Sequence, residues 1–288
     1  MKKIVYLAFI SVSFFFTACT DTTTVTPTCD TAKLPTSEHY QMGNPSAATK
    51  DEANPDNYLL ERKQYVLSYN NSKGSANWVS WRVASDWIGS AQRQDDFRAD
   101  DALPSSFYKA TASSFASSGF DRGHLCPSAD RTSSTTDNSA TFYMSNMIAQ
   151  APNVNQQNWG NMEDYIRKLA SQGNELYVIA GGYGQGGTGS NGAVTKWLDN
   201  KKVTVPAHCW KIVVVLAKGS DDVCRVANDT RVIAVDIPNK QSVGTDPWGD
   251  YRVSIRELET FTGYDFLSNV PKAIQDVIEK NKDTGPTQ

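Results

Sequence analysis

The chain has 288 residues, of which 39% are hydrophobic and 20% are charged, and its formal net charge is −3. This length and composition are those of a globular protein with a sizeable core, and they exclude a largely disordered chain. The acidic balance excludes a protein that coats nucleic acid through a broadly basic surface, although it leaves room for a local phosphate-binding site.

The first predicted element is a signal peptide over residues 1–18. Two lysines precede an apolar run, residues 4–16, that is too short for an ordinary membrane helix and is typical of a secretory signal. The stretch F-T-A-C at its end resembles a bacterial lipoprotein cleavage box, which implies a lipid on Cys19. We therefore expect an exported protein of the cell envelope, in the outer membrane or the periplasm. A plain signal peptide, an incidental Cys19 and secretion are the alternative.

Three further segments follow. Residues 19–57 would begin at the lipidated Cys19 that the resemblance to a lipoprotein cleavage box implies. They are rich in Thr, Pro, Ser, Asn and Asp, which predicts a flexible tether without a core of its own. Residues 58–281 are expected to form a single mixed α/β domain, and residues 282–288 a disordered tail.

Hydrophobic periodicity places the elements of this domain. Strands are predicted at 65–69, 78–83, 141–148, 176–180, 209–216 and 232–237. A helix is predicted at 156–171, because Trp159, Met162, Ile166 and Leu169 form one apolar stripe. Ser254 and Glu257 form a capping box that opens a helix ending near Gly263, and a last helix is predicted at 271–281.

Four cysteines remain after Cys19, an even number that suits an oxidising compartment. Cys209 and Cys224 flank an apolar strand and the turn K-G-S-D-D, so a hairpin could bring them together. A disulfide between Cys209 and Cys224 is therefore predicted.

Residues 119–131 read G-F-D-R-G-H-L-C-P-S-A-D-R and contain one of only three histidines, His124. A histidine can take a proton from water near neutral pH. Arg122 offers a forked donor for a phosphate, and Gly123 lets a substrate approach the backbone closely. On its own this stretch is more typical of a surface turn with a salt bridge.

A second polar stretch, residues 146–163, is dense in amide side chains. Amide oxygens are hard ligands, and Mg²⁺ keeps most of its water and needs few protein ligands. Asn155 lies near the start of the predicted helix, but Glu163 would lie about 12 Å further along a straight helix. Glu163 could then act on the same ion only through a water molecule or from an irregular helix. A polar helix start with caps is the alternative interpretation.

Taken together, the two stretches resemble the DNA/RNA non-specific endonucleases of the ββα-metal group. The motif D-R-G-H-x-x-P begins at Asp121, and N-x-x-x-W-x-x-x-E runs from Asn155 to Glu163. The resemblance extends to residues 205–214 and 250–266 and covers most of residues 58–270. It implies a central mixed or antiparallel sheet flanked by helices, with a hairpin followed by a helix at the active site.

The resemblance also implies roles for individual residues. His124 is similar to the general base, Asn155 to the single protein ligand of Mg²⁺ (for which Mn²⁺ could substitute), and Glu163 to a residue that orients the waters of the ion. Arg122 resembles a phosphate contact, and Asn146 falls where the family has a second active-site amide.

Further substrate contacts are predicted from position rather than from the family motif. These are Arg93, Arg98, Arg131 and Gln150. His208 is interpreted as structural, and Cys126 is given no chemical role.

The implied function is that of a metal-dependent endonuclease acting on the phosphate backbones of DNA and RNA without base specificity, leaving 5′-phosphate ends. The membrane would be contacted only through the lipid, and no oligomeric state is predicted. One alternative is a catalytically silent lipoprotein of the same fold that binds nucleic acid or a protein. The other is a hydrolase of small phosphodiesters, for which a narrow groove would be the sign.

Overall fold

The computed structural model describes Met1, Cys29 and residues 31–288. Cys19 and the predicted signal peptide lie outside the described residues, apart from Met1. Within the described residues, no helix combines the length and apolar character needed to cross a membrane.

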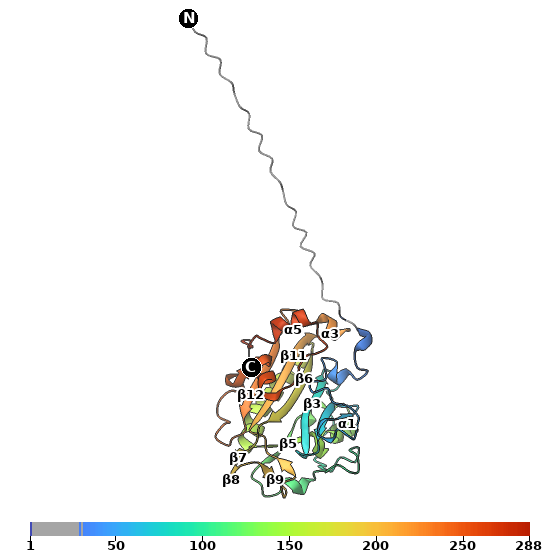
Figure 1. Cartoon of the computed structure of the whole chain (residues 1–288), viewed down its shortest axis with the longest axis vertical. Coiled ribbons are helices and arrows are strands. Elements are labelled where there is room, and N and C mark those ends of the chain that lie inside the picture. Colours follow the sequence, from blue (N-terminus) through green and yellow to red (C-terminus); the bar gives the residue numbers. More distant parts are fainter. Residues whose placement is uncertain (2–28, 30) are drawn as a thin grey trace.

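A seven-stranded antiparallel sheet forms the centre of the molecule (Figure 1). Its spatial order is β1 (Tyr58–Glu61), β2 (Val66–Asn70), β3 (Ser75–Val83), β6 (Asn174–Tyr183), β11 (His208–Ala217), β12 (Val232–Pro238) and β13 (Arg252–Val253). The predicted strands at 65–69, 78–83, 176–180, 209–216 and 232–237 all lie in this sheet. The antiparallel pairing confirms the expected fold class.

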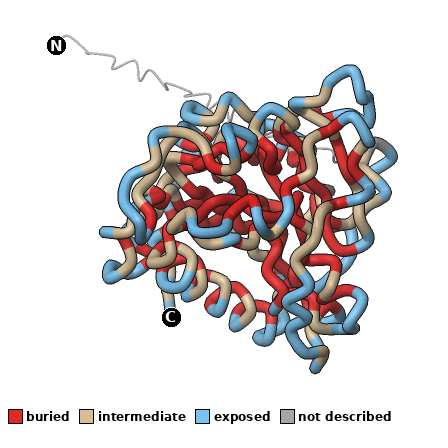
Figure 2. Tube along the Cα trace, turned by 90° about the horizontal axis from the view of Figure 1, so that it is seen from below, coloured by how far each residue is buried: buried red, intermediate tan, exposed pale blue. Residues whose placement is uncertain are grey.

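Each face of the sheet carries a hydrophobic core of its own. Successive side chains along a strand point to opposite faces, so one strand contributes to both cores. On β11, Cys209 and Val213 join one core, whereas Trp210 and Ile212 join the other. Figure 2 shows buried segments concentrated in the interior of the molecule and exposed segments around them. The sheet is therefore a rigid central layer that can hold side chains in fixed positions on either face.

The helices divide between these two faces. Helix α2 (Gly160–Ser171) packs on the first core, and its predicted apolar stripe is confirmed because Trp159, Met162, Ile166 and Leu169 are all buried. Helices α4 (Ile255–Thr262) and α5 (Lys272–Ile278) pack on the second core. The predicted capping box is present, since Ser254 and Glu257 bond reciprocally and Gly263 ends α4 at φ 73°.

Short elements complete the fold. They are α1 (Thr135–Ala140), α3 (Asp222–Arg225), β4 (Asp121–His124), β5 (Met147–Gln150), β7 (Gly187–Gly189), β8 (Gly192–Val194), β9 (Trp197–Leu198) and β10 (Val203–Thr204). The strand predicted at 141–148 is much shorter than expected. The chain instead makes a helical turn at Met144–Asn146 before β5 begins.

The predicted tether is wrong for the described residues up to 57. His39 and Met42 are each only 1% exposed. The His39 ring accepts a hydrogen bond from the Arg82 backbone N–H and donates one to the Lys63 carbonyl. A few anchoring side chains thus fix a segment whose overall composition is that of a linker.

The predicted disordered tail is also wrong. Asp283 accepts hydrogen bonds from the guanidinium groups of Arg231 and Arg252. Arg231 additionally donates to the carbonyl oxygen of Pro286, which fixes the last residues against the body. Polar composition did not reveal these two partners, because they lie far away in the sequence.

The predicted disulfide is replaced by another. Cys29 is bonded to Cys224, with their Cα atoms 5.3 Å apart, and Cys126 and Cys209 are free and buried. Cys209 lies at one end of β11, whereas Cys224 lies in α3, beyond the other end. About 3.3 Å of rise per residue along the strand keeps the two cysteines far apart.

Candidate active site

Two strands and a helix bring the predicted catalytic stretches together. Strands β4 and β5 pair antiparallel, with His124 opposite Met147. The chain then passes into a π-helix, Val154–Trp159, that continues directly as α2. This is the hairpin-then-helix arrangement that the resemblance to the ββα-metal endonucleases implied.

Three hydrogen bonds fix the helix to β4. The indole N–H of Trp159 donates to the carbonyl oxygen of His124 at 3.1 Å. The side-chain amides of Asn155 and Gln156 both donate to Asp121 Oδ2 at 2.8 Å. Asp121 had no role in the sequence analysis beyond its place in the motif. In the structure it orients Asn155, because the hydrogen bond from Nδ2 to Asp121 leaves the amide oxygen, Oδ1, to face the site.

A cavity of about 170 Å³ lies between the hairpin and the helix. It is lined by Arg93, Arg122, His124, Pro127, Ser128, Ala129, Asn155 and Glu163. Asn155 and Glu163 therefore share one cavity despite their separation along the chain. The helix between them is irregular, as one of the two sequence interpretations required, because it begins with a π-helical turn.

His124 is held neutral. Its ring lies edge-on to Phe142 at 5.0 Å between centroids and 5.6 Å from Phe97. Burial, followed by the positive charges of Arg93 and Arg122, lowers the pKa of His124 to about 3. Its Nε2 is buried and has no hydrogen-bond partner among the described residues. An imidazole in this state is able to accept a proton.

Glu163 faces a buried cation. Lys211, on β11, is completely buried, and its ammonium nitrogen lies 3.4 Å from Glu163 Oε1 and 4.0 Å from the centre of the Trp159 ring. Burial raises the pKa of Glu163 to about 7, and the Lys211 charge opposes this rise. Sequence reasoning missed Lys211, although a lysine inside a strongly apolar strand was a visible signal.

Two arginines present positive charge at the cavity. The guanidinium carbon of Arg122 lies 4.1 Å from the centre of the Phe97 ring, and Arg122 has no carboxylate partner within the described part of the chain. Arg93 is half-exposed, pairs with Asp95 and donates to the Ser128 hydroxyl. Both are placed to meet an anion entering the cavity.

Other predicted contacts do not reach this cavity. The guanidinium of Arg131 is fully buried and donates to the carbonyl oxygens of Gln64, Arg82 and Asp130. Arg98 pairs with Asp96 and packs on the Tyr143 ring. Proximity to the motif suggested these arginines, but their donors are already used within the protein.

Gln150 is fully buried, so the predicted contact with the substrate is wrong. Asn146, expected to be a second active-site amide, is fully buried as well. The Asn146 amide bonds to both the backbone N–H and the carbonyl of Cys126, and so holds the segment that follows His124. Gln150 lies beneath Gly123, where a Cβ atom would come within 1.9 Å of its side-chain oxygen. The two amides therefore support the backbone on either side of His124.

The donor set fits a hard divalent cation. In the described residues, no three His, Cys, Asp or Glu side chains gather as a metal cluster. The oxygens available are the Asn155 amide and the Glu163 carboxylate, both lining the same cavity. Few hard oxygen ligands, with water completing the shell, suit Mg²⁺ or Mn²⁺ rather than a thiophilic metal.

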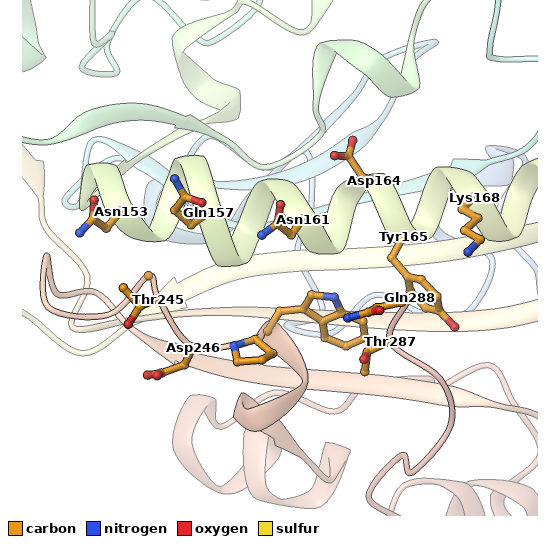
Figure 3. Close-up of a pocket in the computed structure, with 13 residues that line it drawn as sticks. Asn153, Gln157, Asn161, Asp164, Tyr165, Lys168, Thr245, Asp246, Thr287 and Gln288 are labelled. Carbon is orange, nitrogen blue, oxygen red and sulfur yellow. The ribbon is translucent and has the colours of Figure 1, made fainter.

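A larger groove of about 830 Å³ lies on the opposite face of the same helix (Figure 3). Asn153, Gln157 and Asn161 line it from the helix, and Thr245 and Asp246 line it from a facing loop. It is lined by two carboxylates, Asp164 and Asp246, and by one lysine, Lys168, but by no arginine or histidine. These groups are poorly suited to hold a phosphate.

The hairpin-then-helix motif, a neutral histidine, an amide oxygen and two arginines around one cavity define a metal-dependent phosphodiesterase of the ββα-metal type. Comparison with known proteins agrees, because the model of the DNA/RNA non-specific endonuclease family matches residues 42–273. The chain belongs to this family, and it is a hydrolase that cleaves phosphodiester bonds of nucleic acids.

Two relatives illustrate the similarity. The chain is 52% identical over 247 residues to a nuclease from Nostoc sp., covering 86% of each protein. It is 31% identical to the mitochondrial endonuclease G of Homo sapiens, covering 74% of this chain and 70% of the relative.

A solved structure has the same fold. It was described as the EndoG/EndoGI complex in a study of EndoG inhibition, and it matches with a TM-score of 0.65 at 21% identity. The match covers 80% of this chain and 89% of that one.

Proposed function

We propose that the protein hydrolyses internal phosphodiester bonds of DNA and RNA with His124 as general base and one Mg²⁺ held by Asn155, leaving 5′-phosphate ends. The observation that carries this proposal is the shared cavity. It places an unpartnered imidazole nitrogen, an amide oxygen oriented by Asp121 and two arginines within one small volume.

Binding of the scissile phosphate falls to the arginines. Arg122 is exposed and free of carboxylates among the described residues, so it offers a fork of donors to two phosphate oxygens. Arg93, which lines the same cavity, adds a second positive charge. A Mg²⁺ bound to Asn155, with Glu163 orienting its waters, would neutralise charge that develops on the phosphate.

His124 removes the proton from the attacking water. A base must be neutral before it acts, and burial keeps this ring neutral over the whole physiological range. A bound phosphate brings negative charge to the cavity and raises the affinity of the ring for a proton. Phe142 and Phe97 hold the ring, so no reorientation is needed during the transfer.

Discrimination between DNA and RNA is expected to be weak. The cavity presents charged and amide groups that suit a phosphate, and the phosphate is common to DNA and RNA. Phosphate contacts also carry no sequence information. The negative overall charge limits binding to the local arginine pair and the ion.

We further propose that the protein is exported and attached to the envelope through a lipid on Cys19. The disulfide Cys29–Cys224 supports an oxidising compartment. A Cys19→Ser variant should move from the membrane fraction to the soluble fraction. Unchanged fractionation of that variant would reject the anchor.

The enzymatic proposal is tested with supercoiled plasmid and with structured RNA as substrates. Both should be degraded with Mg²⁺, spared after chelation by EDTA, and degraded again when Mg²⁺ or Mn²⁺ is added in excess. End labelling should find a phosphate on each new 5′ end and a hydroxyl on each new 3′ end. Cleavage that persists in EDTA would contradict the metal assignment.

A further inference from the structure

A second hollow adjoins the catalytic cavity. Its volume is about 400 Å³, within the range of pockets that accept small ligands. It is lined by Arg93, Asp95, Phe97, Ala112, Phe115, Ala116, Phe120, Asp121, Arg122 and Asn155. The mechanism above gives no part to Ala112, Phe115, Ala116 or Phe120 of this lining.

The two spaces have common walls. Arg93, Arg122 and Asn155 line both of them. A phosphate in the catalytic cavity therefore lies next to the second hollow. A nucleotide attached to that phosphate can enter the hollow without leaving the protein surface.

The chemistry of the hollow differs from that of the catalytic cavity. Phe115 and Phe120 are buried and form apolar walls, and Phe97 is half-buried with the Arg122 guanidinium over its ring. Ala112 and Ala116 are small, so the space between these walls stays open. Aromatic rings and guanidinium planes are the surfaces on which single-stranded bases stack.

A second phosphate fits this hollow less well than a neutral group. The carboxylates of Asp95 and Asp121 also line it, and they would repel an anion. The phenylalanine walls cannot solvate a phosphate charge. A base is neutral and planar, and its amino groups can donate to carboxylates.

We propose that this hollow binds the base of a nucleotide that flanks the scissile phosphate. The proposal rests on the phosphodiesterase function assigned above and adds a subsite to it. Because stacking accepts every base, the subsite raises affinity without creating sequence specificity.

The test uses single-stranded oligonucleotides with one cleavable phosphodiester among methylphosphonate linkages. The nucleotide on the 5′ or the 3′ side of that bond is either intact or abasic. Stacking is worth roughly 1–3 kcal/mol per base, so loss of the correct base should lower kcat/KM by about 5- to 150-fold in the unaltered enzyme. Loss of the base on the other side should have a smaller effect.

Two variants fill the hollow. Ala116→Trp and, independently, Ala112→Trp should reduce the ratio of kcat/KM for intact and abasic substrates toward one. Ala102→Trp is the matched control, because Ala102 is exposed and lies outside both lining sets, and it should keep the ratio of the unaltered enzyme. Thermal melting checks that each variant is folded.

The base subsite is overturned if no abasic position lowers kcat/KM, or if both filling variants keep or increase the ratio. Failure of the underlying function has a different signature. In that case His124→Ala would cleave the intact oligonucleotide as fast as the unaltered enzyme. This outcome does not depend on the ratio of kcat/KM for intact and abasic substrates.

Discussion

The two faces of the helix from Val154 to Ser171 differ in size and in chemistry. The catalytic cavity on one face measures about 170 Å³, and the groove on the other face about 830 Å³. The smaller space contains His124 with its unpartnered nitrogen, whereas the larger contains amides, two carboxylates and one lysine. Charge and unsatisfied polar atoms, rather than volume, identify the face that carries the chemistry.

A comparison of two asparagines shows that residue type alone does not determine which side chain can bind a metal ion. The Nδ2 atom of Asn155 is held by Asp121, so its oxygen is directed to a cavity that also contains Glu163. Asn153 also has its Nδ2 engaged, by the carbonyl of Gln241, but it lines a groove without histidine or arginine. The neighbours of each amide determine whether it can serve a metal-dependent reaction.

The largest effect is expected from His124→Ala. Loss of a general base should lower kcat by about 10²- to 10⁴-fold in plasmid or oligonucleotide cleavage. KM should change little, because Arg122 and the ion still bind the phosphate. Circular dichroism and thermal melting should show a folded protein. An unfolded variant would instead show that His124 is needed for folding. Its loss of activity would then be no evidence that the smaller cavity carries the reaction.

A smaller loss is expected from Lys211→Met, which removes the cation behind Glu163. Partners of this kind typically contribute 10- to 100-fold to activity. Because the Lys211 charge opposes the burial that raises the Glu163 pKa, its removal should raise that pKa further. Glu163 would then stay protonated to higher pH, and the acid limb of the kcat/KM profile should move upward from about pH 7.

A double-mutant cycle separates this effect from general destabilisation. In a Glu163→Gln background, Lys211→Met should cost little further activity, because the two residues act as one unit. An equal loss in both backgrounds would show that Lys211 supports only the fold.

Removal of the disulfide should affect stability rather than either face of the helix. The sequence separation of Cys29 and Cys224 is 195 residues, and loss of such a link should lower the free energy of unfolding by about 2–5 kcal/mol. Calorimetry of Cys29→Ser/Cys224→Ser should show a lower Tm. The kcat at 25 °C should stay within about twofold of the unaltered enzyme, since neither cysteine lines the cavity. A large loss of kcat in a folded variant would connect the disulfide to the site.

The smallest effect is expected on the face with the larger groove. Gln157→Ala and Asn161→Ala, alone and combined, should leave kcat/KM within about twofold, the scale of ordinary surface substitutions. Steady-state kinetics on the same oligonucleotides provides the measurement. A decrease in kcat/KM as large as that of His124→Ala would show that the larger groove takes part in the reaction.

Local patterns predicted much of the fold and the site motif. The apolar stripe of α2, the capping box of α4 and most strands of the central sheet follow from spacing along the chain. The D-R-G-H motif and the later asparagine and glutamate were brought together because both stretches belong to one hairpin-helix unit.

Long-range partners were beyond this reasoning. Arg131 resembled a phosphate contact until the fold supplied three backbone carbonyls for its donors. Lys211 gained its role only because β11 passes behind α2 and brings its ammonium to Glu163. The sequence left open whether the helix is straight, and the π-helical turn before α2 shows that it is irregular.

The central claim is that Asn155 presents its oxygen to the ion that assists His124. Asn155→Asp tests it most directly when Mg²⁺ affinity, by titration calorimetry, and single-turnover cleavage are measured together. A carboxylate should bind the ion more tightly, yet it adds negative charge where the phosphate develops its own, so tighter binding should accompany slower cleavage. Asn155→Ala should be folded and nearly inactive, because it removes the amide oxygen and only one side-chain hydrogen bond, the bond to Asp121, worth about 1.5–3 kcal/mol. Full cleavage by Asn155→Ala, or Mg²⁺ binding unaltered in both variants, would contradict the account.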